Sequence, residues 1–215
     1  EYVAILKEEL QPAMGCTEPI AVAYCAALAR QTLGALPETV EVLASANIIK
    51  NVKSVIVPNT NGMRGIAAAA AAGIVADNAD AQLQVLAELT PEQVESVGTY
   101  LEQAAFTVGR SDKDYVFDIQ VRVTAGADSA SVEIAGYHTN VIRIEKNGVV
   151  LQHKDYEESA GQHTTDRSLL TVENIIAFAN EVEIADVQET LQRQIDYNWA
   201  IAEEGLRGDY GANIG

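Results

Sequence analysis

Cys16 is the residue whose type and position most directly suggest chemistry. It stands within Met14-Gly15-Cys16-Thr17-Glu18-Pro19, immediately before a segment that predicts a helix. A thiol at a helix N-terminus lies near unpaired backbone N–H groups and the positive end of the helix dipole, which favour the thiolate. Glu18 opposes this effect if its carboxylate lies close to the thiol. From the residues alone, a reactive thiolate and an inert buried cysteine both stay open.

His138 is the histidine best placed for acid–base chemistry. It lies in the polar segment Gly136-Tyr137-His138-Thr139-Asn140, between two predicted strands. There an imidazole can act as a general acid or base, or bond to a carboxylate. A turn histidine bonded to nearby backbone is the alternative. The histidines and the two cysteines show no spacing typical of a zinc site, and Cys25 is expected in the core of its helix.

Two polar clusters interrupt apolar segments, at 45–51 and at 59–65. Their amide and cationic side chains are suited to binding a substrate carboxylate, although ordinary turn chemistry explains them as well. The second cluster lacks the pattern of a phosphate-binding loop.

Composition narrows the class of protein. The chain has 215 residues, with 14 Lys and Arg against 31 Asp and Glu, a formal net charge of -17. This charge argues against a nucleic acid or an anionic membrane as a partner. Two cysteines are too few for a disulfide framework or for a cluster held by three or four cysteines of this chain. With no leader sequence or membrane span recognisable, the expected location is the cytoplasm.

The periodicities predict an α+β fold in which N-terminal helices and a mixed sheet precede an antiparallel β-meander and C-terminal helices. The chain 1–215 is read as one α+β region. Asn147-Gly148 predicts a tight hairpin turn. Predicted helices are 2–10, 18–33, 65–76, 91–105, 172–180 and 187–204, and predicted strands are 40–44, 54–57, 116–124, 129–135, 140–145 and 149–152; 83–89 is ambiguous, and 155–167 and the glycine-rich C-terminus are read as loops.

Several motifs together resemble the L-cysteine desulfidase family, UPF0597-like proteins related to the α chain of iron–sulfur L-serine dehydratases. They are Gly15-Cys16-Thr17-Glu18-Pro19, Asn47-Ile48-Ile49-Lys50-Asn51, His138-Thr139-Asn140, Arg143-Ile144-Glu145-Lys146-Asn147-Gly148 and Gly211-Ala212-Asn213-Ile214-Gly215. The resemblance spans nearly the whole chain in the same order.

The resemblance implies a bacterial lyase that converts L-cysteine to pyruvate, ammonia and hydrogen sulfide with a [4Fe-4S] cluster and without pyridoxal phosphate. Cys16 matches the family's candidate thiolate base. Glu18, Asn47, Lys50, Asn51, His138, Thr139 and Asn140 are the candidates for binding the amino-acid substrate.

Members of this family run to about twice the present length, and their cluster-binding cysteines belong to the C-terminal half. The chain is therefore interpreted as an N-terminal half that holds no metal itself and needs the missing half or a partner chain, so that it is inactive alone. Where relatives look more glycine-rich and carry a lysine, this chain has Asn59–Gly65 with Arg64.

The alternatives are an L-serine dehydratase, which needs the same proton abstraction, and a non-catalytic amino-acid-binding or regulatory fragment in which Cys16 is inert. A structural dimerisation domain is a third, suggested by the alanine-rich segment, and a homodimer is left open.

Overall fold

The computed structural model describes residues 1–12, 15–156 and 165–208, which fall into two compact units. Ala13–Gly161 forms the first unit, and Glu1–Pro12 with Gln162–Gly215 forms the second. Each is described by itself. Within the described ranges no helix is both long and apolar enough to cross a membrane.

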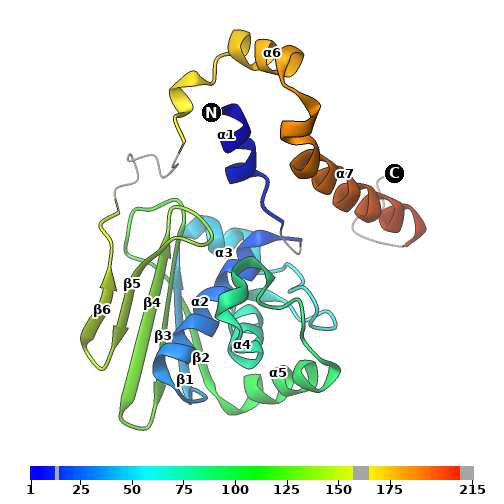
Figure 1. The fold of residues 1–215 in the computed structure, drawn as a ribbon. Helices are drawn as coiled ribbons and strands as arrows, with labels where there is room; N and C mark the ends of the chain where they lie inside the picture. Colours follow the sequence, from blue (N-terminus) through cyan, green and yellow to red (C-terminus); the bar gives the residue numbers. More distant parts are fainter. Residues whose placement is uncertain (13–14, 157–164, 209–215) are drawn as a thin grey trace. The chain divides into compact units, whose positions relative to one another are not determined.

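A six-stranded mixed sheet forms one layer of the first unit (Figure 1). Its order is β2-β1-β3-β4-β5-β6, with β1 and β2 parallel and all other pairs antiparallel. The strands are β1 (Thr39–Ala44), β2 (Ala105–Arg110), β3 (Asp118–Ala125), β4 (Asp128–Ala135), β5 (Val141–Lys146) and β6 (Val149–His153).

Helix α2 (Thr17–Leu33) lies on the face of this sheet and is the centre of the core. It packs against β3 and β4 on one side and against α4 (Gly65–Ala76) on the other. The small side chains of α4 allow a close approach, and a Cβ built at Gly73 would lie 1.9 Å from the Ala23 carbonyl oxygen. Helix α4 also contacts β1 and β2, so α2 and α4 together cover one face of the sheet.

The crossover from β1 to β2 carries the remaining helices of this unit: α3 (Ala46–Val52), α4, the 3₁₀ helix η1 (Ala79–Gln84) and α5 (Pro91–Gln103). Thr90 and Gln93 form a capping box at the start of α5, bonding reciprocally to each other's backbone N–H.

The second unit contains α1 (Tyr2–Glu9), the 3₁₀ helix η2 (Arg167–Leu169), α6 (Val172–Glu181) and α7 (Ile184–Arg207). Helix α1 packs against α7, and the Tyr2 and Phe178 rings stack with centroids 4.9 Å apart. Arg167 pairs with Glu8 at 2.7 Å. These contacts join the two ends of the chain.

The α+β fold, the antiparallel meander and its Asn147-Gly148 turn are confirmed, the turn having both residues at positive φ. The predicted strand 54–57 is wrong, because only Ile56 forms an isolated bridge, to Arg64. The segment between β1 and 54–57 forms helix α3. This helix begins where the Ser45 hydroxyl accepts a hydrogen bond from the Ile48 N–H. Strand β2 is not among the predicted strands. The ambiguous segment 83–89 begins within the 3₁₀ helix η1. The motif at 211–215 lies outside the described residues.

Candidate functional site

The Glu18 carboxylate is the centre of a polar cluster at the start of α2. It accepts a hydrogen bond from the Cys16 thiol, 3.3 Å from Sγ to Oε2, and one from the Asn51 amide, 3.3 Å from Nδ2 to Oε1. Thr17 Oγ1 lies 3.3 Å from Oε2 and donates to it as well. The carboxylate thus joins the first turn of α2 to the last turn of α3.

The Cys16 thiol is held in its protonated form. Burial raises its pKa, and the hydrogen bond and negative charge of Glu18 raise it further. Cys16 is the N-cap of α2, but its side chain makes no capping hydrogen bond. The opposing influence of Glu18 that the sequence suggested is therefore present in the structure, and the sulfur rests as a hydrogen-bond donor.

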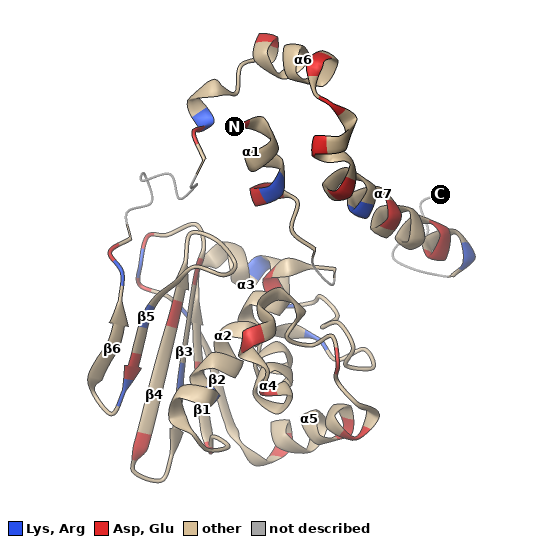
Figure 2. Cartoon of the chain, in the orientation of Figure 1, with Lys and Arg blue, Asp and Glu red and all other residues tan. Residues whose placement is uncertain are grey.

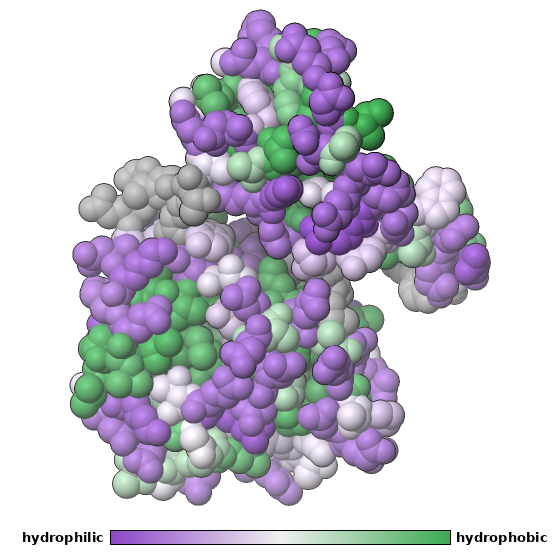
Figure 3. All heavy atoms as spheres, in the orientation of Figure 1, coloured by the Kyte–Doolittle hydropathy of each residue, from purple (hydrophilic) through white to green (hydrophobic). Residues whose placement is uncertain are grey.

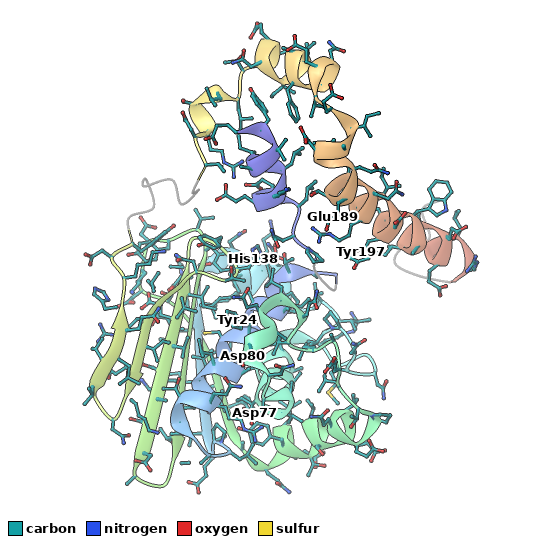
Figure 4. All side chains as sticks on the ribbon, viewed as in Figure 1. Tyr24, Asp77, Asp80, His138, Glu189 and Tyr197 are labelled. Carbon is teal, nitrogen blue, oxygen red and sulfur yellow. The ribbon has the colours of Figure 1, made fainter. Side chains whose placement is uncertain are left out.

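His138 lies in the turn after β4 (Figure 4), and its imidazole interacts electrostatically with the Glu18 carboxylate. Burial lowers its pKa, while the negative charge of Glu18 raises it by a smaller amount, so the imidazole is neutral at pH 7. Burial raises the pKa of Glu18, but its backbone N–H, Cys16, His138 and Asn51 together bring it below its ordinary value. Within the described residues, His138 Nε2 is buried and has no hydrogen-bond partner.

Local backbone geometry sets these side chains in place. Gly136, at φ +83°, donates its N–H to the Phe117 carbonyl at 3.0 Å and so fixes the turn that carries His138. The Phe117 ring packs edge-on against the imidazole with centroids 4.7 Å apart. Sequence reasoning missed this role of Phe117, because its alternation in the strand pattern marks it only as apolar. Gly15, at φ +116°, adopts the left-handed conformation just before Cys16.

Among the described residues, Asn140 forms hydrogen bonds within the turn after β4 and with Lys154, and not with Glu18. Its amide donates to the Ala135 carbonyl at 2.7 Å, and its oxygen accepts from Lys154 at 2.8 Å. Thr139 is partly buried in the same turn and accepts the Val141 N–H at its carbonyl.

Asn47 and Lys50 are exposed on α3, and no hydrogen bond or ion pair among the described residues joins them to Glu18. Asn47 lies one helical turn before Asn51, so both occupy the same face of α3. The structure thus brings Cys16, Glu18, Asn51 and His138 together and does not bring Asn47 or Lys50 into contact with Glu18 among the described residues.

The cluster at 59–65 makes turn contacts. Asn59 donates to the Leu86 carbonyl at 3.0 Å, Thr60 to the Val57 carbonyl at 2.7 Å, and Arg64 to the Ser54 carbonyl at 2.7 Å. These bonds occupy the side chains that the sequence offered for binding a carboxylate.

No group of three or more His, Cys, Asp or Glu side chains in the described part of the chain could hold a metal ion. Cys25 is fully buried in α2, 3.5 Å from the Val132 carbonyl oxygen, and burial raises its pKa well above the ordinary value. It is a core residue, as the sequence predicted.

A separate hollow of about 290 Å³ lies on the open face of the sheet. Its charged side chains are paired with one another: Arg143 with Glu145 at 2.8 Å, Arg122 with Glu41 at 3.7 Å, and Lys113 with Glu133. The pairing stabilises this face of the sheet and leaves the cluster around Glu18 as the candidate site.

The homologues of this chain are UPF0597 proteins of bacteria, matched along its full length. It is 49% identical over 214 residues to one from Desulfitobacterium hafniense, 44% identical over 215 residues to one from Lachnoclostridium phytofermentans, and 41% identical over 216 residues to one from Treponema denticola. The chain spans about half the length of these curated relatives, 50%, 51% and 50% respectively. No protein-family model and no solved structure matches it.

Proposed function

We propose that this chain supplies the acid–base part of the active site of a lyase that eliminates hydrogen sulfide from L-cysteine, giving pyruvate and ammonia. The observation that carries the proposal is the gathering of the Cys16 thiol and the His138 imidazole around the Glu18 carboxylate. Elimination needs a base for the α-proton and a charge that orients the amino acid, and these side chains offer both.

The resting site suggests how the base forms. The ammonium group of the substrate is attracted to the Glu18 carboxylate, and pairing offsets the negative charge that, after burial, helps to raise the thiol pKa. The Cys16 proton can then pass to water, and the thiolate takes the α-proton and returns to the thiol. The electron pair left on Cα forms the Cα–Cβ double bond as hydrosulfide leaves Cβ, and the resulting enamine hydrolyses to pyruvate and ammonia. The neutral imidazole of His138, whose buried Nε2 has no hydrogen-bond partner within the described residues, is the candidate for a second proton acceptor beside the same carboxylate.

The resemblance to desulfidases also implies a [4Fe-4S] cluster and no pyridoxal phosphate. The described residues do not form a cluster site, so its ligands are expected in the part of the longer protein that this chain does not match. The proton transfers assigned to Cys16 and His138 use only side chains of this chain, and neither passes through the cluster. The chain alone is expected to be inactive, and the complete bacterial protein is expected in the cytoplasm.

The test is a chimera in which this chain replaces the matching half of the Desulfitobacterium hafniense relative. After anaerobic reconstitution with iron and sulfide, sulfide release from L-cysteine is measured, with L-serine as the competing substrate. Cys16→Ala and Glu18→Gln are expected to lower kcat by at least about a hundredfold, and Cys25→Ala, which removes the other thiol, is expected to retain activity.

Other outcomes separate the alternatives. Faster turnover of L-serine would assign the site to a dehydratase. The protonated resting thiol favours the amino-acid-binding alternative. That alternative predicts that a reconstituted chimera binds L-cysteine without turnover, and this result would overturn the lyase proposal.

A further inference from the structure

Helix α7 carries a long apolar stripe of which, among the described residues, only Val187 is buried. Ile184, Val187, Leu191, Ile195, Trp199 and Leu206 recur at spacings of three, four and seven residues, which places them on one face of a helix. We call this set the α7 stripe.

Helix α1 packs against α7 but leaves Ile184, the first residue of the α7 stripe, 75% exposed. Val187 and Thr190 are buried, as is Ile5 of α1, and Arg193 donates a hydrogen bond to the Leu10 carbonyl at 3.3 Å. An eight-residue helix spans about 12 Å and a 24-residue helix about 36 Å. Helix α1 is thus too short to follow the stripe to its end.

Apart from Val187 and the partly buried Leu191, the α7 stripe is exposed. Ile195 is 56% exposed, Trp199 66% and Leu206 89%. Figure 3 shows hydrophobic residues scattered among hydrophilic ones on the visible face of this unit. A row of large apolar side chains at helical spacing, with an aromatic residue near its centre, is the pattern of a helix that packs against a further surface.

We propose that the α7 stripe is the surface on which the remainder of the longer protein packs, meaning the half of the relatives that this chain does not match. The relatives are about twice as long, so an element of that size is available to cover it. Acidic residues predominate on α6 and α7 (Figure 2). The covering surface should therefore be apolar at its centre and rimmed by Lys or Arg side chains.

Trp199 makes the proposal directly testable, because it is the only tryptophan of the chain. Labelled with 5-fluorotryptophan, the 215-residue chain gives one ¹⁹F resonance, whose solvent isotope shift reports exposure. The same measurement is made on the chimera with the Desulfitobacterium hafniense half, where Trp199→Phe identifies the resonance. We expect an exposed signal in the chain alone at every concentration and a shielded signal in the chimera.

The remaining outcomes overturn the proposal. Shielding in the chain alone at all concentrations would mean that the Ala13–Gly161 unit covers the stripe. Shielding that grows with concentration would identify a second copy as the occupant. Exposure in both proteins would leave the stripe uncovered.

Matched variants locate the contact. Ile195 lies on the stripe and is 56% exposed, and Ile201 is 67% exposed and lies about 120° away from it around the helix axis. Ile195→Glu is therefore the test variant, and Ile201→Glu makes the same change as its control. We expect Ile195→Glu to expose Trp199 again and to lower the unfolding midpoint of the chimera but not of the chain alone, and Ile201→Glu to do neither. Equal effects would refute the assignment of the face. Because this readout needs no turnover, its failure is distinguishable from failure of the proposed function.

Discussion

Replacing Gly73 by alanine should separate two buried helices that cannot easily move apart. The added Cβ would lie 1.9 Å from the Ala23 carbonyl oxygen, whereas real Cβ contacts essentially never fall below 3.0 Å. The helices would have to shift by roughly 1 Å, the difference between these distances, against dense packing. Helix α2 cannot retreat, because its other side packs on β3 and β4.

The magnitude follows from two opposing effects. Overpacking of a core costs about 1–3 kcal/mol or more, and a backbone atom yields less than a flexible side chain. Exchanging glycine for alanine inside a helix returns roughly 1 kcal/mol. We therefore expect Gly73→Ala to lower the free energy of unfolding by about 2 kcal/mol, which is roughly 4–8 °C in the midpoint of a chain of this size.

Gly98 in α5 is the matched control. A Cβ there would meet only the Met63 methyl at 3.6 Å, an ordinary contact, so Gly98→Ala should stabilise by about 0.5–1 kcal/mol. Both variants are followed by urea unfolding with far-ultraviolet circular dichroism. If Gly73→Ala stabilised the protein as Gly98→Ala should, the close approach of α4 and α2 would be refuted.

Two further predictions concern the candidate site, and a third concerns the turn that carries His138. Glu18→Gln is expected to speed alkylation of Cys16 near pH 8, because it removes the charge that helps to raise the thiol pKa; an unchanged rate would contradict this. Burial lowers the pKa of His138 in the folded chain below its ordinary 6.5. As the pH falls, the unfolded chain therefore binds the proton before the folded chain does. The stability that His138 contributes above pH 6.5 is lost as the pH falls through the folded-state pKa. His138→Gln should flatten that part of the stability curve measured by denaturant titration, and an equally steep curve would count against the assignment. Asn140→Ala is expected to cost about 1–3 kcal/mol in urea unfolding, because its buried amide bonds the Ala135 carbonyl; a loss below about 0.5 kcal/mol would mean that backbone bonds alone close the turn.

Local patterns are enough to predict the elements that depend on local signals. Helix α2 is expected at 18–33 and runs Thr17–Leu33, ending at Gly34 in the left-handed conformation. The alanine helix and the meander strands likewise lie where periodicity places them. Helix caps, turns and strand alternation depend on neighbouring residues, so a short stretch of sequence is enough to predict these elements.

The errors fall where distant contacts decide the structure. The apolar run 54–57 reads as a strand, yet Val57 is buried without a strand partner among the described residues. Strand β2 forms because β1 lies beside it in parallel after a long crossover, which no local window reveals. At the site, the proximity of Cys16 and Glu18 is readable from the sequence, whereas Asn51 and Phe117 reach the cluster only through the tertiary fold.

The strand order also has a kinetic consequence. Strands β3 to β6 pair with sequence neighbours through short turns, whereas β1 pairs with β2 and β3, which lie more than 60 residues away in the chain. Closing such long loops costs entropy before contacts compensate. We therefore expect the meander to gain hydrogen-exchange protection first during refolding and β1 to gain it late. Because α3 follows β1 directly and carries Asn51, the cluster around Glu18 would be completed in the same late step.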